Sequence, residues 1–273
     1  MFDTISSQAS KLINLTNRVR NSKPSKTKLI TVTSGKGGVG KSTFTANIAF
    51  LLSQRGYKVA VIDADIGLAN MQVLFNMKPK YTLFDYIDGM KTLEEVTLKT
   101  SYDNLYLVAG KSGYQYSNHS NSFVFSRIVQ DLISLNKFDI ILVDTGAGLN
   151  DYVKEFLTIS DNILAITTTD PSALTDVYSL MKMLSFDKNK LMLCFNHTKN
   201  YKIGLTIANS LVNLAKKNRL NNDFMVEYIG NVSTSANIST TGRLRKLFTN
   251  EFIQDDSTKQ LQVIIDYLLK NIH

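Results

Sequence analysis

Short apolar runs alternate with amphipathic stretches along most of the chain. From residue 29 onward, seven runs of about five residues are apolar at nearly every position, which is typical of strands buried on both faces of a sheet. These predicted strands span 29–33, 59–63, 105–109, 140–144, 163–167, 191–195 and 225–229. Apolar residues at every third or fourth position between them predict helices over 43–55, 123–136, 149–158, 173–185 and 204–218. The alternation predicts a doubly wound α/β fold, with a mostly parallel sheet of about seven or eight strands flanked by helices.

The two ends of the chain carry helical stripes of their own. An N-terminal helical arm is predicted over 1–20, followed by a polar, basic linker over 21–28 and a main domain over 29–256. Residues 257–273 predict a C-terminal amphipathic helix. Its apolar stripe comprises Leu261, Ile264, Ile265, Leu268, Leu269 and Ile272. The stripe either binds a membrane surface or packs on the protein's own core; its weakly basic polar face leaves both alternatives open.

Composition narrows the class of protein. With 273 residues, 44% of them hydrophobic and 20% charged, the chain is typical of a globular protein with a substantial core. No apolar run approaches the ~20 residues that span a bilayer, and the first residues lack the apolar core of a signal peptide, so we expect a cytoplasmic location. The only cysteine, Cys194, excludes an internal disulfide and a cysteine-built metal cluster within one chain. The net charge of +8 fits solubility as well as nucleic-acid binding, so it does not predict the latter.

A glycine-rich segment between the first predicted strand and the first predicted helix matches the pattern G-x-x-x-x-G-K-[ST]. Glycines let consecutive backbone N–H groups turn toward an anion, and the start of the following helix adds its positive dipole end. Lys41 is placed to contact the β- and γ-phosphates of a nucleotide, and the Ser42 hydroxyl is placed to bind Mg²⁺. The predicted nucleotide-binding residues are Gly37, Gly38, Val39, Gly40, Lys41, Ser42 and Thr43.

Two of the predicted strands end in aspartate. Asp63 closes the second strand and Asp144 closes the fourth. A carboxylate at the end of a buried strand needs a cation, a helix N-terminus or a positive neighbour, because burial without a partner is costly. Beside a phosphate loop we favour Mg²⁺ binding for both, with helix capping as the alternative. Asp65 is placed to face the γ-phosphate and orient a water, and Gly146 and Gly148 suit a loop that moves when the γ-phosphate leaves.

A second lysine in the phosphate loop, Lys36, points to a family. With it, the loop resembles the deviant phosphate loop of the MinD/ParA class of ATPases. Residues 62–70 resemble the first switch loop of that class, and residues 143–149 resemble the second. Within the class, the segments 144–148 and 168–178 are similar to the flagellar-number regulators of the FlhG (FleN, YlxH) type. The resemblance covers essentially the whole chain and implies a MinD-like P-loop NTPase fold.

The resemblance also implies a mechanism. ATP with Mg²⁺ would join two subunits face to face as a homodimer, and slow hydrolysis to ADP would separate them. Lys36 would reach the phosphates held by the partner subunit, Lys41 would hold those of its own, and Asp65 would position the attacking water. Asn196 matches the position that contacts adenine, with a structural Asx turn as the alternative. Mg²⁺ would be held through Ser42, Asp63 and Asp144, and the switch loops would include Asp65, Gly67, Thr145, Gly146 and Gly148.

The N-terminal arm resembles a short motif of FlhG proteins that stimulates the GTPase FlhF. It matches that motif at Gln8, Ala9 and Leu12 and departs from it at Ser7 and Ile13. The resemblance therefore implies an FlhF-type GTPase and flagellar or transcriptional components as partners, together with a membrane surface if the C-terminal helix binds one. Nucleic acid is not an expected partner.

Three other functions share this phosphate loop. One is a DNA-partitioning ATPase of the ParA type, and another is a division-site ATPase of the MinD type. The third is a carrier of metal clusters, which needs clustered cysteines and is disfavoured by the lone Cys194. The N-terminal arm and the C-terminal stripe favour the flagellar regulator over a partitioning ATPase. The arm and the Thr145-Gly146 sequence of the second switch favour it over a division-site ATPase.

Overall fold

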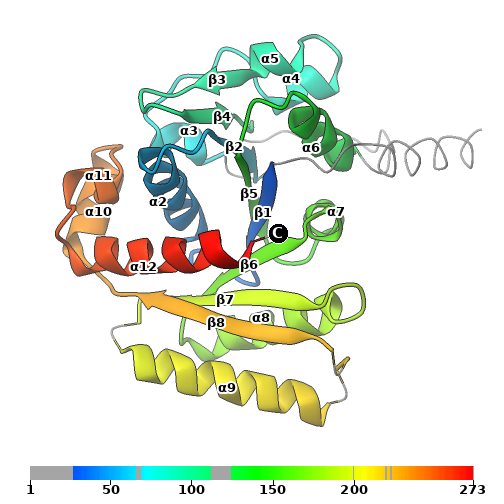
Figure 1. Cartoon of the computed structure of the whole chain (residues 1–273), viewed down its shortest axis with the longest axis vertical. Coiled ribbons are helices and arrows are strands. Elements are labelled where there is room, and N and C mark those ends of the chain that lie inside the picture. The colour runs from blue at the N-terminus through cyan, green and yellow to red at the C-terminus, as the bar shows by residue number, and fades with distance from the viewer. Residues whose placement is uncertain are drawn as a thin grey trace, which may run out of the picture.

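The structure is a computed structural model that describes residues 27–65, 69–111, 124–198, 200–218, 220–221 and 223–272. Within these residues, eight strands form one sheet in the order β3-β4-β2-β5-β1-β6-β7-β8 (Figure 1). The strands are β1 (Lys28–Ser34), β2 (Val59–Ala64), β3 (Thr97–Lys99), β4 (Leu105–Val108), β5 (Ile140–Ala147), β6 (Asn162–Thr167), β7 (Lys190–Asn196) and β8 (Met225–Val232). Neighbouring strands run parallel except for β3, which pairs antiparallel with β4.

Helices cover both faces of this sheet (Figure 1). They are α2 (Lys41–Gln54), α3 (Met71–Leu74), α4 (Leu83–Ile87), α5 (Leu93–Val96), α6 (Val124–Ser134), α7 (Asp151–Ile159), α8 (Pro171–Leu184), α9 (Tyr201–Lys217), α10 (Ala236–Arg243), α11 (Phe248–Glu251) and α12 (Asp256–Asn271). Along β5, Ile140 and Leu142 enter the core shared with α2 and α12, whereas Ile141 and Val143 enter the core shared with α6. Alternate side chains of a strand point to opposite faces, so a strand covered on both sides is apolar throughout. The predicted doubly wound α/β fold is confirmed.

The differences from prediction lie at the ends of elements and at the edge of the sheet. All seven predicted strands are present. The sheet contains one additional strand, β3, which the sequence did not predict because three residues are too few for a periodic pattern. The helices α3, α4, α5, α10 and α11 are also unpredicted, since each has only four to eight residues. The helix predicted over 149–158 begins at Asp151 because the side chain of Asn150 caps it by accepting a hydrogen bond from the Val153 N–H.

The C-terminal helix α12 packs its apolar stripe into the core. Leu261, Ile264, Ile265 and Leu268 are at most 1% exposed and join the same core cluster as α2, with Leu269 and Ile272 partly buried against it. Arg55 at the end of α2 forms an ion pair of 2.7 Å with Asp266. Burying each of four large aliphatic side chains contributes roughly 1.5–3 kcal/mol. The core-packed alternative therefore describes this state, and exposing the stripe to a membrane would cost on the order of 6 kcal/mol or more.

Some predictions fall on residues that the structure does not describe. The N-terminal arm over 1–20, with Gln8, Ala9 and Leu12, lies outside the described residues, as do most of the linker and Gly67. Among the helices that are described, none combines the length and the apolar character needed to cross a membrane.

Candidate phosphate-binding site

The predicted site residues gather at one edge of the sheet. The phosphate loop follows the C-terminal end of β1, Asp63 and Asp65 stand at the end of β2, Asp144 lies near the end of β5, and Asn196 ends β7. The C-terminal ends of parallel strands meet at the same edge, where open α/β sheets bind their ligands. The fold thus brings together side chains that are more than 150 residues apart in the chain.

The phosphate loop needs its glycines for two different reasons. Gly38 and Gly40 have positive φ angles of 79° and 88°, a region that other residues rarely adopt. A β-carbon on Gly40 would also stand 2.5 Å from Asn196 Nδ2, so a larger residue would displace the asparagine. Gly40 is the N-cap residue of α2, and the Phe44 N–H donates a 2.9 Å hydrogen bond to its carbonyl. The loop therefore delivers its backbone directly to the first turn of α2, as a phosphate site requires.

Asn196 braces the phosphate loop from the side. Its Nδ2 donates a 2.8 Å hydrogen bond to the carbonyl oxygen of Val39, and its Oδ1 accepts one of 2.9 Å from the backbone N–H of His197. The side chain is 7% exposed. This contact is a structural role that neither sequence alternative contained, because it joins the end of β7 to the phosphate loop, and no local pattern connects the two. The adenine contact of Asn196 stays a prediction.

Lys41 and Asp144 form a buried ion pair beneath the loop. Lys41 Nζ lies 2.9 Å from Asp144 Oδ1, and the side chains are 7% and 0% exposed. The hydroxyl of Thr45, one turn further along α2, donates a 3.0 Å hydrogen bond to the same oxygen. The other oxygen, Asp144 Oδ2, is buried and has no hydrogen-bond partner among the described residues. Helix capping does not account for Asp144, because it lies within β5 and Asn150 caps the following helix.

Asp63 stands beside Asp144 in the pairing of β2 with β5. It is 1% exposed and accepts hydrogen bonds from the backbone N–H groups of Met71 at 3.0 Å and Asp65 at 3.3 Å. Burial, and secondly the neighbouring charge of Asp144, raise the pKa of Asp63 to about 7. Met71 is the first residue of α3, so the hydrogen bond that Asp63 accepts from it helps to cap that helix. Helix capping was the alternative to metal binding that the sequence left open for Asp63. Two adjacent buried carboxylates with one lysine leave the cluster short of positive charge.

The residues of this cluster fit a magnesium ion. Carboxylate and hydroxyl oxygens are the ligands Mg²⁺ prefers, and Asp63, Asp144 and Ser42 supply them. A cation near the unpaired Asp144 Oδ2 would also stabilise the ionised form of Asp63, whose charge is costly without it. The described residues contain no group of three or more His, Cys, Asp or Glu side chains that could hold a metal alone. That agrees with Mg²⁺ sites completed by water and phosphate oxygens rather than by protein ligands.

Lys36, at the other end of the loop, contacts α8 instead of the buried carboxylates. Its Nζ lies 3.5 Å from Asp170 Oδ1 and donates a hydrogen bond to the Ser172 hydroxyl. Asp170 is the N-cap of α8, and the hydrogen bonds from Ser172 and Ala173 lower its pKa to about 2, with Lys36 adding a smaller effect. Lys36 and Asp170 are 43% and 55% exposed, so solvent screens this pair. The segment 168–178 is therefore next to the phosphate loop, a relation that the sequence did not predict.

The second switch segment is tied to the sheet more firmly than a free loop. The Thr145 hydroxyl hydrogen-bonds the Val32 carbonyl at 3.2 Å, and the Gly148 N–H donates to the Ser34 carbonyl at 3.1 Å. Gly148 has a φ of +83°, which suits glycine. Asp65 is half-buried at the edge facing this segment. Thr145, Gly146 and Asp65 thus lie near one another, while their action as switches stays a prediction.

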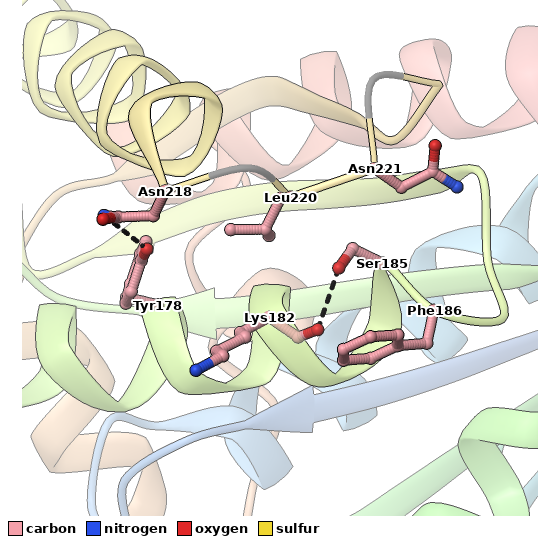
Figure 2. Close-up of a pocket in the computed structure, with 7 residues that line it drawn as sticks. All are labelled: Tyr178, Lys182, Ser185, Phe186, Asn218, Leu220 and Asn221. Carbon is pink, nitrogen blue, oxygen red and sulfur yellow. Dashed lines mark hydrogen bonds between the residues drawn. The ribbon is translucent and has the colours of Figure 1, made fainter.

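One cavity lies away from this site. It has a volume of about 620 Å³ and is lined by Tyr178, Lys182, Ser185, Phe186, Asn218, Leu220 and Asn221 (Figure 2). Tyr178 and Lys182 lie in α8, and the other residues lie just beyond the C-terminal ends of α8 and α9. Asn218 Nδ2 donates a 2.9 Å hydrogen bond to the Tyr178 hydroxyl. None of these residues belongs to the phosphate site.

Comparisons with known proteins agree with this geometry. A family profile described as "ParA: NUBPL iron-transfer P-loop NTPase" matches residues 25–269. The chain is 35% identical to the flagellum site-determining protein YlxH of Helicobacter pylori over 98% of this chain and 92% of that protein. It is 36% identical to the antiactivator FleN of Pseudomonas aeruginosa over 58% of this chain and 57% of that protein.

Solved structures show the same fold. The cell division ATPase MinD of Pyrococcus furiosus aligns with a TM-score of 0.76 at 22% identity, covering 89% of this chain and 98% of that one. The septum site-determining protein MinD of Pyrococcus horikoshii OT3, solved in complex with Mg-ADP, aligns with a TM-score of 0.76 at 20% identity, covering 90% of this chain and 98% of that one. At such identities the likeness concerns the fold alone.

Proposed function

The chain belongs to the ParA family of P-loop NTPases, and on this premise we propose that it is a MinD-like ATPase that regulates the number or placement of flagella. The single observation that supports nucleotide chemistry most directly is the buried cluster of Lys41, Asp63 and Asp144 under the phosphate loop. When Asp63 is ionised, the cluster has more negative than positive charge, and Asp144 Oδ2 has no hydrogen-bond partner among the described residues. Hydrated Mg²⁺ bound with ATP is the ligand that would balance it.

Most residues of the site would bind the phosphates or the magnesium ion, and one would orient the attacking water. The backbone of the loop and the start of α2 would hold the phosphates, and Lys41 would turn from Asp144 toward the β- and γ-phosphates. Magnesium, when bound, supplies positive charge where negative charge develops during phosphoryl transfer. Asp63, Asp144 and Ser42 would hold its hydration shell, and Asp65 would orient the attacking water.

The position of Lys36 suggests that one subunit alone does not complete the phosphate site. In the isolated chain its ammonium rests on Asp170 and Ser172, at an exposed position outside the buried cluster. We propose that in an ATP-bound homodimer it leaves α8 and reaches the phosphates held by the partner subunit. Two facing triphosphates need additional neutralisation, which a lysine from the opposite subunit supplies. Hydrolysis would remove that attraction and separate the subunits.

The flagellar role is supported by the similarity to YlxH over 98% of the chain. A partnership with an FlhF-type GTPase would run through the N-terminal arm, which lies outside the described residues. A cytoplasmic location with reversible membrane association would require α12 to expose its buried stripe.

The description of the matching family profile mentions iron transfer, but we do not propose that this chain binds iron or an iron cluster as cargo. The chain has one cysteine, Cys194, and it is buried in β7.

Size-exclusion chromatography with light scattering tests the switch directly. We expect a monomer with ADP and a dimer with ATP and Mg²⁺, and we expect Asp65→Ala to stay dimeric because it binds ATP without turning it over. Including liposomes of anionic lipid tests α12 in the same experiment. A wild-type chain that is monomeric with ATP, together with normal ATP hydrolysis, would remove the dimer from the proposal.

The biological part needs a separate test. In cells that lack the chain, the number of flagella is counted after complementation with the wild type, with Lys41→Ala and with Asp65→Ala. We expect only the wild type to restore the normal count.

A partitioning ATPase would instead retain random DNA in the presence of ATP, and the amount retained would fall steeply as the salt concentration rises. Deleting residues 1–20 should leave basal hydrolysis intact and abolish stimulation of the GTPase.

A further inference from the structure

The two switch segments meet at Gly146. This residue is buried near the end of β5, and a β-carbon built on it would stand 2.9 Å from the Tyr152 hydroxyl oxygen. The same β-carbon would stand 3.6 Å from Asp65 Oδ1. A phenol and a carboxylate, from the start of α7 and the end of β2, therefore face the same small space. Glycine is required there because any side chain would occupy that space.

Tyr152 is held in place independently of Asp65. Its ring packs against Phe125 of α6, with centroids 6.3 Å apart, and joins the partly buried residues on two core clusters. It is the second residue of α7, directly after the cap at Asn150, so the helix start fixes its backbone. Asp65 comes from a different element, the end of β2, and its carboxylate lies on the same side of Gly146 as the Tyr152 hydroxyl. The two groups therefore meet where the first and second switch segments approach each other.

The protonation of Tyr152 suits a donor. Burial, and to a lesser degree the charge of Asp65, raise the pKa of the Tyr152 phenol above its usual value, against a lowering by the hydrogen bond with Asn150. The phenol is therefore protonated at neutral pH and carries a proton that it can donate to a neighbouring acceptor. A hydrogen bond to a charged group is stronger than one between neutral groups.

We propose that Tyr152 is a positioning residue of the ATPase reaction, whose hydroxyl restrains the Asp65 carboxylate beside Gly146 and so links the first switch segment to the second. The proposal rests on the proposed function, in which Asp65 orients the attacking water. A carboxylate held in the productive orientation presents the water in line with the phosphate, so a group that fixes this orientation raises the rate of hydrolysis. Tyr152 belongs to no sequence motif, and it becomes relevant only when β2, β5 and α7 are assembled.

The central experiment is the kinetics of Tyr152→Phe, which keeps the ring against Phe125 and removes only the hydroxyl. We expect kcat for ATP hydrolysis to fall about 5- to 20-fold, while KM for ATP and ATP-dependent dimerisation stay within about twofold. The same substitution in an Asp65→Ala background should cause no further loss, because the residue it positions is gone. Gly146→Ala should lower kcat in the wild type and add little in Tyr152→Phe, where the closest contact is absent.

Tyr86→Phe is the matched control, since the Tyr86 hydroxyl donates a 2.6 Å hydrogen bond to Asp131 far from the phosphate loop. It should leave kcat unchanged. An unchanged kcat in Tyr152→Phe, with Asp65→Ala inactive, overturns the positioning role and leaves the proposed function standing. So does a loss that persists in full in the Asp65→Ala background. Wild-type turnover by Asp65→Ala instead refutes the role of Asp65 in the proposed function, and the Tyr152 proposal with it.

Discussion

The two lysines of the phosphate loop stand five positions apart and occupy opposite environments. Lys41 is buried, pairs with Asp144 and is surrounded by elements of the same subunit. Lys36 is 43% exposed and rests on the capping residues of α8. Removing one partner of a buried ion pair typically costs 3–5 kcal/mol, whereas an exposed pair contributes about 0–1 kcal/mol. The fold therefore fixes the first lysine and leaves the second free to change partners.

This difference in burial assigns two tasks to the two ends of the loop: nucleotide binding to the Lys41 end, and contact with a second subunit to the Lys36 end. The Lys41 end belongs to the monomer, because its carboxylates, helix start and hydroxyl are all present in one chain. The Lys36 end holds a contact weak enough to be exchanged for a stronger one, such as a triphosphate on a second subunit. Four substitutions test this contrast, and they are given in order of decreasing expected effect.

Lys41→Ala should have the largest effect. It removes the charge closest to the phosphates and leaves Asp63 and Asp144 as two buried carboxylates without a cation. We expect ATP affinity to fall more than 100-fold, measured by titration calorimetry, with circular dichroism to verify folding and Lys41→Gln as a variant of similar length. Binding of ATP at wild-type affinity by either variant would contradict the site assignment.

Lys36→Ala should separate binding from assembly. Because Lys36 is not part of the buried cluster, we expect ATP affinity of the monomer to change less than about threefold. Dimerisation and turnover should fall about 10- to 100-fold, since the facing phosphates lose a charge. Analytical ultracentrifugation at several protein concentrations measures the first, and phosphate release measures the second. A loss of ATP binding as severe as that of Lys41→Ala would abolish the contrast between the two ends.

Asp63→Asn should make the nucleotide-free protein more stable above neutral pH. The unfolded chain ionises Asp63 above pH 4, whereas burial keeps it protonated in the folded state up to a pKa of about 7. The folded state therefore loses stability as pH rises from 4 to 7, and asparagine removes this cost. We expect a gain of about 1–2 kcal/mol in urea unfolding at pH 8 that shrinks toward pH 5. A variant less stable than the wild type at pH 8 would show that the carboxylate is already balanced within the monomer.

Asp170→Asn should have the smallest effect. Asparagine caps helices as well as aspartate does, so α8 is retained while the charge facing Lys36 disappears. We expect the ATP-dependent dimer to form about two- to fivefold more tightly, because Lys36 is released at less cost. Thr206→Ala, on the exposed face of α9, is a control without a role at the loop. Weaker dimerisation in Asp170→Asn would mean that Asp170 itself contributes to the subunit interface.

Prediction from the sequence succeeded where the signal was local or periodic. The strands are apolar over their full length because helices cover both faces, so their pattern identifies them without further information. Gly40 and Lys41 are adjacent in one motif, and the chemistry of that motif depends on local backbone geometry. The short strand β3 and the helices α3 to α5 escaped prediction, because three to five residues complete no periodic repeat.

The contacts between distant elements were beyond such reasoning. The sequence predicted that Asn196 contacts the base or forms a turn, and the structure shows that its side chain donates a hydrogen bond to the Val39 carbonyl in the phosphate loop. The contact of Lys36 with Asp170 depends on α8 lying beside the loop. The raised pKa of Asp63 arises because strand pairing places it opposite Asp144, a residue 81 positions away.

The fold class, the phosphate loop and the carboxylates near the ends of β2 and β5 can be predicted from the sequence, since each is encoded in a short stretch of chain. The burial of Lys41, the exposed and exchangeable contact of Lys36 and the packing of the α12 stripe into the core become visible only in the folded molecule. These three features share one cause. Burial and charge balance depend on neighbours that the chain brings together only when it folds, so they are properties of the assembled sheet and its helices rather than of any segment.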